Sequence, residues 1–228
     1  MPTDSEHALS CQTPSARPAA AAVEKELPQL PWDDDKLKEE CGIFGVFGVT
    51  DAASFVALGL HALQHRGQEA GGIVCHDPEL GFNSTRRFGL VRDNFTSQSV
   101  IDGLPGPISI GHVRYSTAGS KGATQIRDVQ PFFGEFSMGG AAIAHNGNLT
   151  NAAQLRDELE LNGSIFQTTV DSEIILHLMA RPSGNGDSNL VQSLQRIKGA
   201  YSLVIMTENE LIGVRDPMGV RPLVLGKL

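Results

Sequence analysis

The order of the short apolar segments after residue 40 is the feature that most constrains the fold. Glycine, proline and asparagine separate these segments, which predict strands at 43–47, 70–75, 86–91, 108–115, 139–145, 200–206 and 211–215. Three helical stripes lie between the fifth and the sixth of these strands. Strands at both ends with helices between them predict two sheets covered by helices, an α+β layered domain.

Apolar residues spaced three and four apart predict the helices. The first begins at an N-cap, Asp51, and its apolar face is made by Ala52, Phe55, Val56, Gly59, Leu60 and Leu63. Three more helices are predicted at 152–159, 174–179 and 190–197. The segment from Gly139 to His145 is rich in very small residues, which predicts that another layer packs tightly against this strand.

Residues 1–40 differ from the rest of the chain in composition. They are rich in serine, proline and alanine and hold nine acidic against four basic side chains, so they carry five of the eight net negative charges. Such a stretch buries too little apolar surface to offset its ordering entropy, and we expect a disordered leader. Neither part of the chain has the basic bias of a nucleic-acid binder.

Cysteine usage and hydropathy indicate the compartment. The three cysteines are odd in number and widely spaced, which argues against a disulfide framework and for a reducing environment. No segment approaches the roughly 20 apolar residues that a membrane span needs. We therefore expect a cytoplasmic protein with neither a membrane nor a nucleic acid as partner.

Cys41 directly follows the leader and is the first candidate for chemistry. A lone cysteine before an apolar strand is typical of an inert core residue. At the start of a processed chain, however, it would combine a nucleophilic sulfur with an α-amine whose pKa is about 7.7–8.0, close to working pH. In the chain as written Cys41 is in peptide linkage to Glu40, so this interpretation predicts a precursor.

Three further sites each allow a functional and a structural interpretation. Arg114, at a predicted strand end, could bind a small carboxylate in a bidentate pair or form a structural salt bridge. Asn146 and Gly147 could hold an oxyanion or form a hairpin turn. Asp171 could bind a substrate ammonium group or serve as the N-cap of the helix that follows.

Taken together, these segments resemble the class II glutamine amidotransferase domain, an N-terminal-nucleophile hydrolase. The resemblance begins at Cys41 and rests on six motifs: Cys41-Gly-Ile-Phe-Gly, Leu63-Gln-His-Arg-Gly-Gln-Glu-Ala-Gly71, His112-Val-Arg-Tyr-Ser-Thr117, His145-Asn-Gly147, Asp171-Ser-Glu173 and Arg215-Asp-Pro-Met-Gly-Val-Arg-Pro-Leu223. It implies a four-layer αββα sandwich of two mainly antiparallel sheets between helices. It also implies a propeptide at 1–40 and an amidotransferase domain at 41–228.

The resemblance implies a role for each candidate. Cys41 would attack the side-chain amide of glutamine, and its freed α-amine would shuttle the proton. Asn146 and the Gly147 N–H would stabilise the oxyanion. Arg114 would hold the substrate carboxylate with Thr117 nearby, and Asp171 would bind the ammonium group.

Within this family the chain resembles the amidophosphoribosyltransferase branch, which begins de novo purine synthesis. The Leu63-Gln-His-Arg segment and Tyr115 differ from the hexosamine-forming relatives. This branch implies a following phosphoribosyltransferase domain that uses phosphoribosyl pyrophosphate with Mg²⁺, an iron–sulfur cluster in some members, and a homo-oligomer. No cofactor is expected within 41–228. The alternatives are the glutaminase domain of a hexosamine-phosphate or glutamate synthase, or a non-catalytic module of the same fold.

Overall fold

The computed structural model describes residues 41–115, 125–137, 139–181 and 189–227. The expectations for the leader at 1–40 and for Thr117 lie outside these residues. Within them the chain forms two antiparallel sheets of four strands each, with the strand orders β1-β4-β2-β3 and β5-β6-β7-β8.

The first sheet comes from the N-terminal half of the described chain. Its strands are β1 (Gly42–Phe47), β2 (Ala70–Asp77), β3 (Gly81–Phe88) and β4 (Ile108–Arg114). The helical elements of this half are α1 (Ala52–Ala62), η2 (Gln64–Arg66), α2 (Val91–Asn94) and α3 (Gln98–Asp102). The apolar face of α1 packs against β1, β2 and β4, and its residues Val56 and Leu60 are fully buried.

The second sheet comes from the C-terminal half. Its strands are β5 (Phe132–Phe136), β6 (Gly139–Leu149), β7 (Gly199–Thr207) and β8 (Leu211–Arg215). The helical elements are η3 (Ile126–Asp128), α4 (Ala152–Leu161), α5 (Ser172–Met179) and α6 (Asn189–Arg196). Leu159, Ile174 and Ile175 are fully buried in a core that these helices share with β6 and β7.

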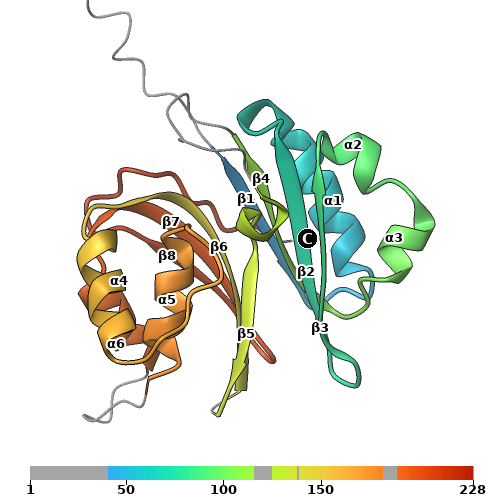
Figure 1. Ribbon diagram of the computed structural model, residues 1–228. Coiled ribbons are helices and arrows are strands. Elements are labelled where there is room, and N and C mark those ends of the chain that lie inside the picture. The colour runs from blue at the N-terminus through green and yellow to red at the C-terminus, as the bar shows by residue number, and fades with distance from the viewer. Residues whose placement is uncertain (1–40, 116–124, 138, 182–188, 228) are drawn as a thin grey trace, which may run out of the picture. The chain divides into compact units, whose positions relative to one another are not determined.

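The two sheets face each other, and the helices cover their outer sides (Figure 1). Ile110 and Val74 of the first sheet share a core with Ala142, Ala144 and Met206 of the second. The small residues of β6 permit this close packing, because a Cβ on Gly140 would lie only 2.3 Å from the ring of Phe82 on β3. The predicted four-layer αββα sandwich is therefore confirmed.

Three details of the predicted elements are wrong. The weak strand expected at 86–91 is β3, which ends at Phe88, and α2 begins at Val91. Strand β5 and the short helices α2 and α3 were not predicted. Strand β6 continues to Leu149, four residues beyond the expected end at His145, so the Asn146-Gly147 pair lies within a strand.

Candidate active site

Cys41 lies directly before β1, at the end of the first sheet where β4 ends. The β1–β4 register pairs Gly42 with Val113, so Cys41 stands beside Arg114. The Cys41 N–H donates to the Arg66 carbonyl at 3.1 Å, and Arg66 Nε donates back to the Cys41 carbonyl at 2.8 Å. Cys41 has a φ of +65°, a region that residues other than glycine rarely adopt. A buried arginine thus holds the candidate nucleophile on both sides.

Arg114 is the last residue of β4, and its guanidinium is about one-fifth exposed. Its Nε lies 3.3 Å from Glu69 Oε2, and its Nη1 donates to the Asp128 carbonyl at 3.0 Å. The structural salt bridge that the sequence allowed is therefore present. A guanidinium has five N–H groups, so these two contacts leave it able to bind a carboxylate as well.

The hairpin alternative for Asn146 and Gly147 is wrong, because β6 pairs with β7 in unbroken register from Ala141 to Leu149. Backbone N–H groups alternate sides along an antiparallel strand. The N–H groups of His145 and Leu149 point away from β7, since they donate to Gln130 Oε1 at 2.8 Å and to Asp171 Oδ2 at 2.9 Å. The Gly147 N–H, midway between them, points to the same open edge.

Asn146 is the neighbouring amide in this strand. Its side chain is buried, and its Oδ1 accepts no hydrogen bond within the described residues. A buried polar group without a partner is costly and is often found where a site receives a ligand. The unpartnered Oδ1 is an acceptor, whereas an oxyanion would need the Nδ2 group of Asn146 as its donor, so this observation marks a polar opening and leaves the oxyanion role a prediction from the resemblance.

Asp171 stands at the N-cap position of α5, but its side chain makes no capping hydrogen bond. Its Oδ2 accepts from Leu149 N–H, and its Oδ1 lies 3.4 Å from Nδ1 of the buried His145. Burial alone would raise the pKa of Asp171, but the hydrogen bonds from His145, Leu149 and Ser172 together hold that pKa below its ordinary value. Asp171 is thus an ionised carboxylate at the open edge of β6, as ammonium binding would require.

Asp128, in η3, connects the two halves of the site. Its carbonyl accepts from Arg114, and its Oδ1 accepts from the Thr169 N–H at 3.3 Å, two residues before Asp171. Sequence reasoning missed Asp128 and the clamping role of Arg66. Arg66 falls within the Leu63-Gln-His-Arg motif, which could have pointed to it.

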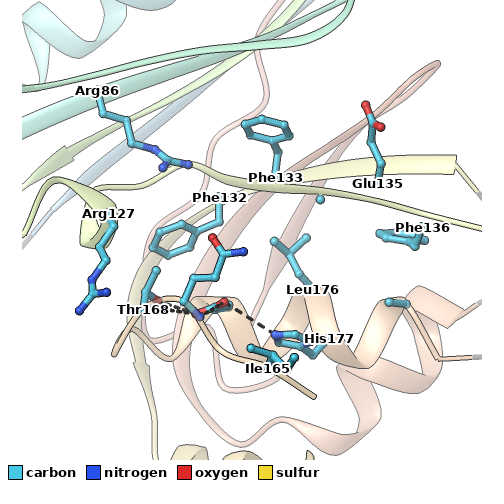
Figure 2. Close-up of a pocket in the computed structure, with 14 residues that line it drawn as sticks. Arg86, Arg127, Phe132, Phe133, Glu135, Phe136, Ile165, Thr168, Leu176 and His177 are labelled. Atoms are coloured by element: carbon cyan, nitrogen blue, oxygen red, sulfur yellow. Dashed lines mark hydrogen bonds and ion pairs between the residues drawn. The ribbon is translucent and has the colours of Figure 1, made fainter. Parts of the chain in front are cut away.

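A separate cavity of about 270 Å³ lies between β5 and α5. Figure 2 shows Arg86 and Phe133 on one side of it and His177 on the other. Among the predicted site residues that the structure describes, none lines this cavity. Glu173, which does line it, accepts hydrogen bonds from the backbone N–H groups of Gln167 and Thr168 at 2.8 Å each and so serves the local structure.

The described residues contain neither a metal-binding cluster nor a membrane-spanning helix. No group of three or more histidine, cysteine, aspartate or glutamate side chains is arranged to hold a metal ion. None of the helices in these segments has the length and apolar character needed to cross a bilayer.

Known proteins are similar to this chain in sequence and in fold. Residues 114–228 match the family model described as a glutamine amidotransferase domain. An amidophosphoribosyltransferase of Rhizobium etli is 50% identical over 199 residues, which cover 87% of this chain and 39% of the relative. One of Lacticaseibacillus casei is 43% identical, over 86% of this chain and the full length of that sequence.

The solved structures agree with these matches. The glutamine phosphoribosylpyrophosphate amidotransferase of B. subtilis, complexed with ADP and GMP, superposes with a TM-score of 0.69 at 42% identity, over 79% of this chain and 38% of that one. The chain thus spans well under half the length of several relatives. It belongs to the glutamine amidotransferase domain family, in the group formed by the amidophosphoribosyltransferases.

Proposed function

We propose that this chain is the glutaminase part of an amidophosphoribosyltransferase and that Cys41 is its nucleophile. One observation carries the proposal: Cys41 lies beside Arg114 at one end of the first sheet, and Asp128 connects Arg114 to Thr169, in the segment that leads to Asp171. The Asp171 carboxylate in turn accepts from Leu149 N–H at the end of β6, the strand that carries Asn146 and Gly147. Family membership supports the same assignment.

The site contains the groups that amide hydrolysis needs. Cys41 Sγ adds to the side-chain carbonyl carbon of glutamine, and the resulting oxyanion accepts hydrogen bonds from Gly147 N–H and the Asn146 amide. Collapse of this intermediate breaks the C–N bond, and the α-amine of Cys41 delivers the thiol proton to the departing ammonia. Water then cleaves the γ-glutamyl thioester to glutamate and regenerates the thiol.

Substrate recognition would use the opposite charges of the site. The α-carboxylate of glutamine pairs with Arg114, and its α-ammonium group pairs with Asp171, whose lowered pKa keeps it ionised at neutral pH. Thr117 is assigned a place beside the carboxylate on the family resemblance alone.

The whole enzyme would use the ammonia to displace pyrophosphate from phosphoribosyl pyrophosphate and give 5-phosphoribosylamine, with Mg²⁺ bound in a phosphoribosyltransferase domain. The names of the relatives support the amidophosphoribosyltransferase activity, whereas Mg²⁺, the further domain and the product rest on the family resemblance alone. Homo-oligomerisation, a cytoplasmic location and an iron–sulfur cluster stay predictions from the sequence.

Glutamine turnover by the purified chain tests the proposal. We expect release of glutamate and ammonia, a mass that corresponds to loss of residues 1–40, and abolition of turnover by Cys41→Ala. The control is Cys75→Ala, since Cys75 is fully buried in the first sheet. Turnover that persists in Cys41→Ala, or that accompanies an intact leader, would refute the assignment.

A further inference from the structure

Strand β6 has an open edge in the region of the oxyanion donors. Strand β5 pairs with it only from Phe136↔Gly139 to Phe132↔Ile143, whereas β6 itself continues to Leu149. Beyond Ile143, no described strand therefore satisfies the backbone groups that point away from β7. The buried ones must find partners elsewhere.

Gln130 supplies these partners for His145. Continuing the β5–β6 register by two further residues would place residue 130 opposite residue 145. The side chain of Gln130, rather than its backbone, makes this pairing: Oε1 accepts from His145 N–H at 2.8 Å, and Nε2 donates to the His145 carbonyl at 3.3 Å. A carboxamide carries the same donor and acceptor as a peptide group, so it can replace one residue of a strand.

Gln130 is itself firmly held. Only 7% of it is exposed, and its backbone carbonyl packs against Gly72 of β2, where a Cβ would lie 2.3 Å from the carbonyl oxygen. The next carbonyl, that of Pro131, accepts from Arg86 Nη2 at 2.8 Å. Both contacts come from the first sheet, so the carboxamide is fixed relative to the sheet that carries Cys41.

We propose that Gln130 is a positioning residue for the oxyanion donors: its carboxamide replaces a missing strand residue, fixes the His145 peptide and thereby orients Asn146 and the Gly147 N–H. The inference rests on the proposed function. Asp171 performs the equivalent task two residues beyond Gly147, where it accepts from Leu149 N–H. The donor of Gly147 thus lies between two backbone groups that side chains hold in place.

The proposal requires that small displacements matter, and they do in oxyanion holes. Donors act at about 2.7–3.1 Å from the developing charge, and removal of one donor costs about 10²–10³-fold in kcat. Loss of the Gln130 carboxamide would displace the donors rather than remove them. His145 would keep its second tether, the 2.9 Å contact between Nδ1 and Ser172 Oγ, so the strand should stay in place on average.

The test compares Gln130→Met with wild type in two reactions of Cys41. Glutamine hydrolysis passes through an oxyanion, whereas alkylation by iodoacetamide is a direct displacement that forms none. We expect kcat for glutamine to fall about 10- to 100-fold, with KM changed less than about threefold and the rate of Cys41 alkylation unchanged. The matched control is Gln98→Met on α3, where the side chain is exposed and donates to Asp102.

Gln130→Glu provides a second variant. It keeps an oxygen that can accept from His145 N–H, but its second oxygen faces the His145 carbonyl in a site that is only 7% exposed, so the lost donor and the repulsion between the two oxygens should also lower kcat. A kcat within twofold of wild type in both variants would overturn the proposal. So would a parallel loss of alkylation and turnover, which would indicate general distortion. A wild-type chain that is processed yet hydrolyses no glutamine would instead refute the proposed function, and this inference with it.

Discussion

The buried imidazole of His112 should make folding stability depend on pH. His112 lies in the middle of β4 and is 1% exposed. Burial, and after it the electrostatic influence of His145 and Arg114, lowers its pKa from 6.5 to about 3, although a hydrogen bond with the His145 backbone opposes this shift. As the pH falls, the unfolded chain therefore protonates His112 first, while the native state still keeps this side chain neutral.

The size of the effect follows from this difference in pKa. The unfolded chain binds a proton below about pH 6.5, whereas the folded chain does not until about pH 3, so stability is complete above pH 6.5 and is lost as the pH falls. Between pH 7 and pH 5 the free energy of unfolding should drop by about 2 kcal/mol on account of His112 alone. This magnitude depends on the pKa of His112 in the unfolded chain, because at pH 5 the His112 side chain of the folded protein is still unprotonated.

Urea unfolding followed by circular dichroism at pH 7 and pH 5 measures this difference. His112→Gln removes the titrating group, so the variant should lose about 2 kcal/mol less than wild type over the same interval. His61→Gln, on the exposed end of α1, is the matched control and should lose as much as wild type. Equal losses in wild type and His112→Gln would refute the reasoning.

Two further predictions concern the backbone at Gly147 and the thiol of Cys75. A Cβ on Gly147 would lie 2.1 Å from the Ala200 carbonyl oxygen, and the residue has a φ of +147°, so Gly147→Ala should lower the free energy of unfolding by about 1–3 kcal/mol. Gly134→Ala in β5, which meets no atom within 4 Å, is the control, and equal urea midpoints would contradict this expectation. Burial, opposed by a hydrogen bond to Ser109, raises the pKa of Cys75 to about 12, so iodoacetamide should label it only after unfolding. Labelling of Cys75 in native protein, detected by peptide mass spectrometry, would count against its burial.

Local sequence pattern predicted those elements whose burial is regular. Helix α1 and strand β2 have uninterrupted apolar faces, and both were found close to the expected bounds. Strand β3 was misplaced because it is a half-buried edge strand with polar residues from Asn83 to Arg87. Strand β5 is another edge strand of only five residues, too short for its period to be recognised.

The candidate site divides in the same way. Cys41, Asn146 and Asp171 stand in motifs that the sequence displays directly. Gln130 does not, because its hydrogen bonds reach a strand 15 residues away and depend on where β5 stops pairing. Residues that act by holding another residue's backbone have no local pattern, and only the three-dimensional register reveals them.

The close approach of Gly72 to Gln130 has a consequence for interpreting damage to this protein. Position 72 is in the interior of strand β2 and is not one of the predicted site residues. A methyl group added there directly changes only the packing of the strand. The extra carbon would displace the Gln130 carbonyl. Because the Gln130 carboxamide is hydrogen-bonded to the His145 peptide, this displacement would also move the edge of β6. We therefore expect a Gly72→Ala chain to fold, to lose its leader and to bind glutamine, but to stabilise the oxyanion poorly and so to hydrolyse glutamine slowly.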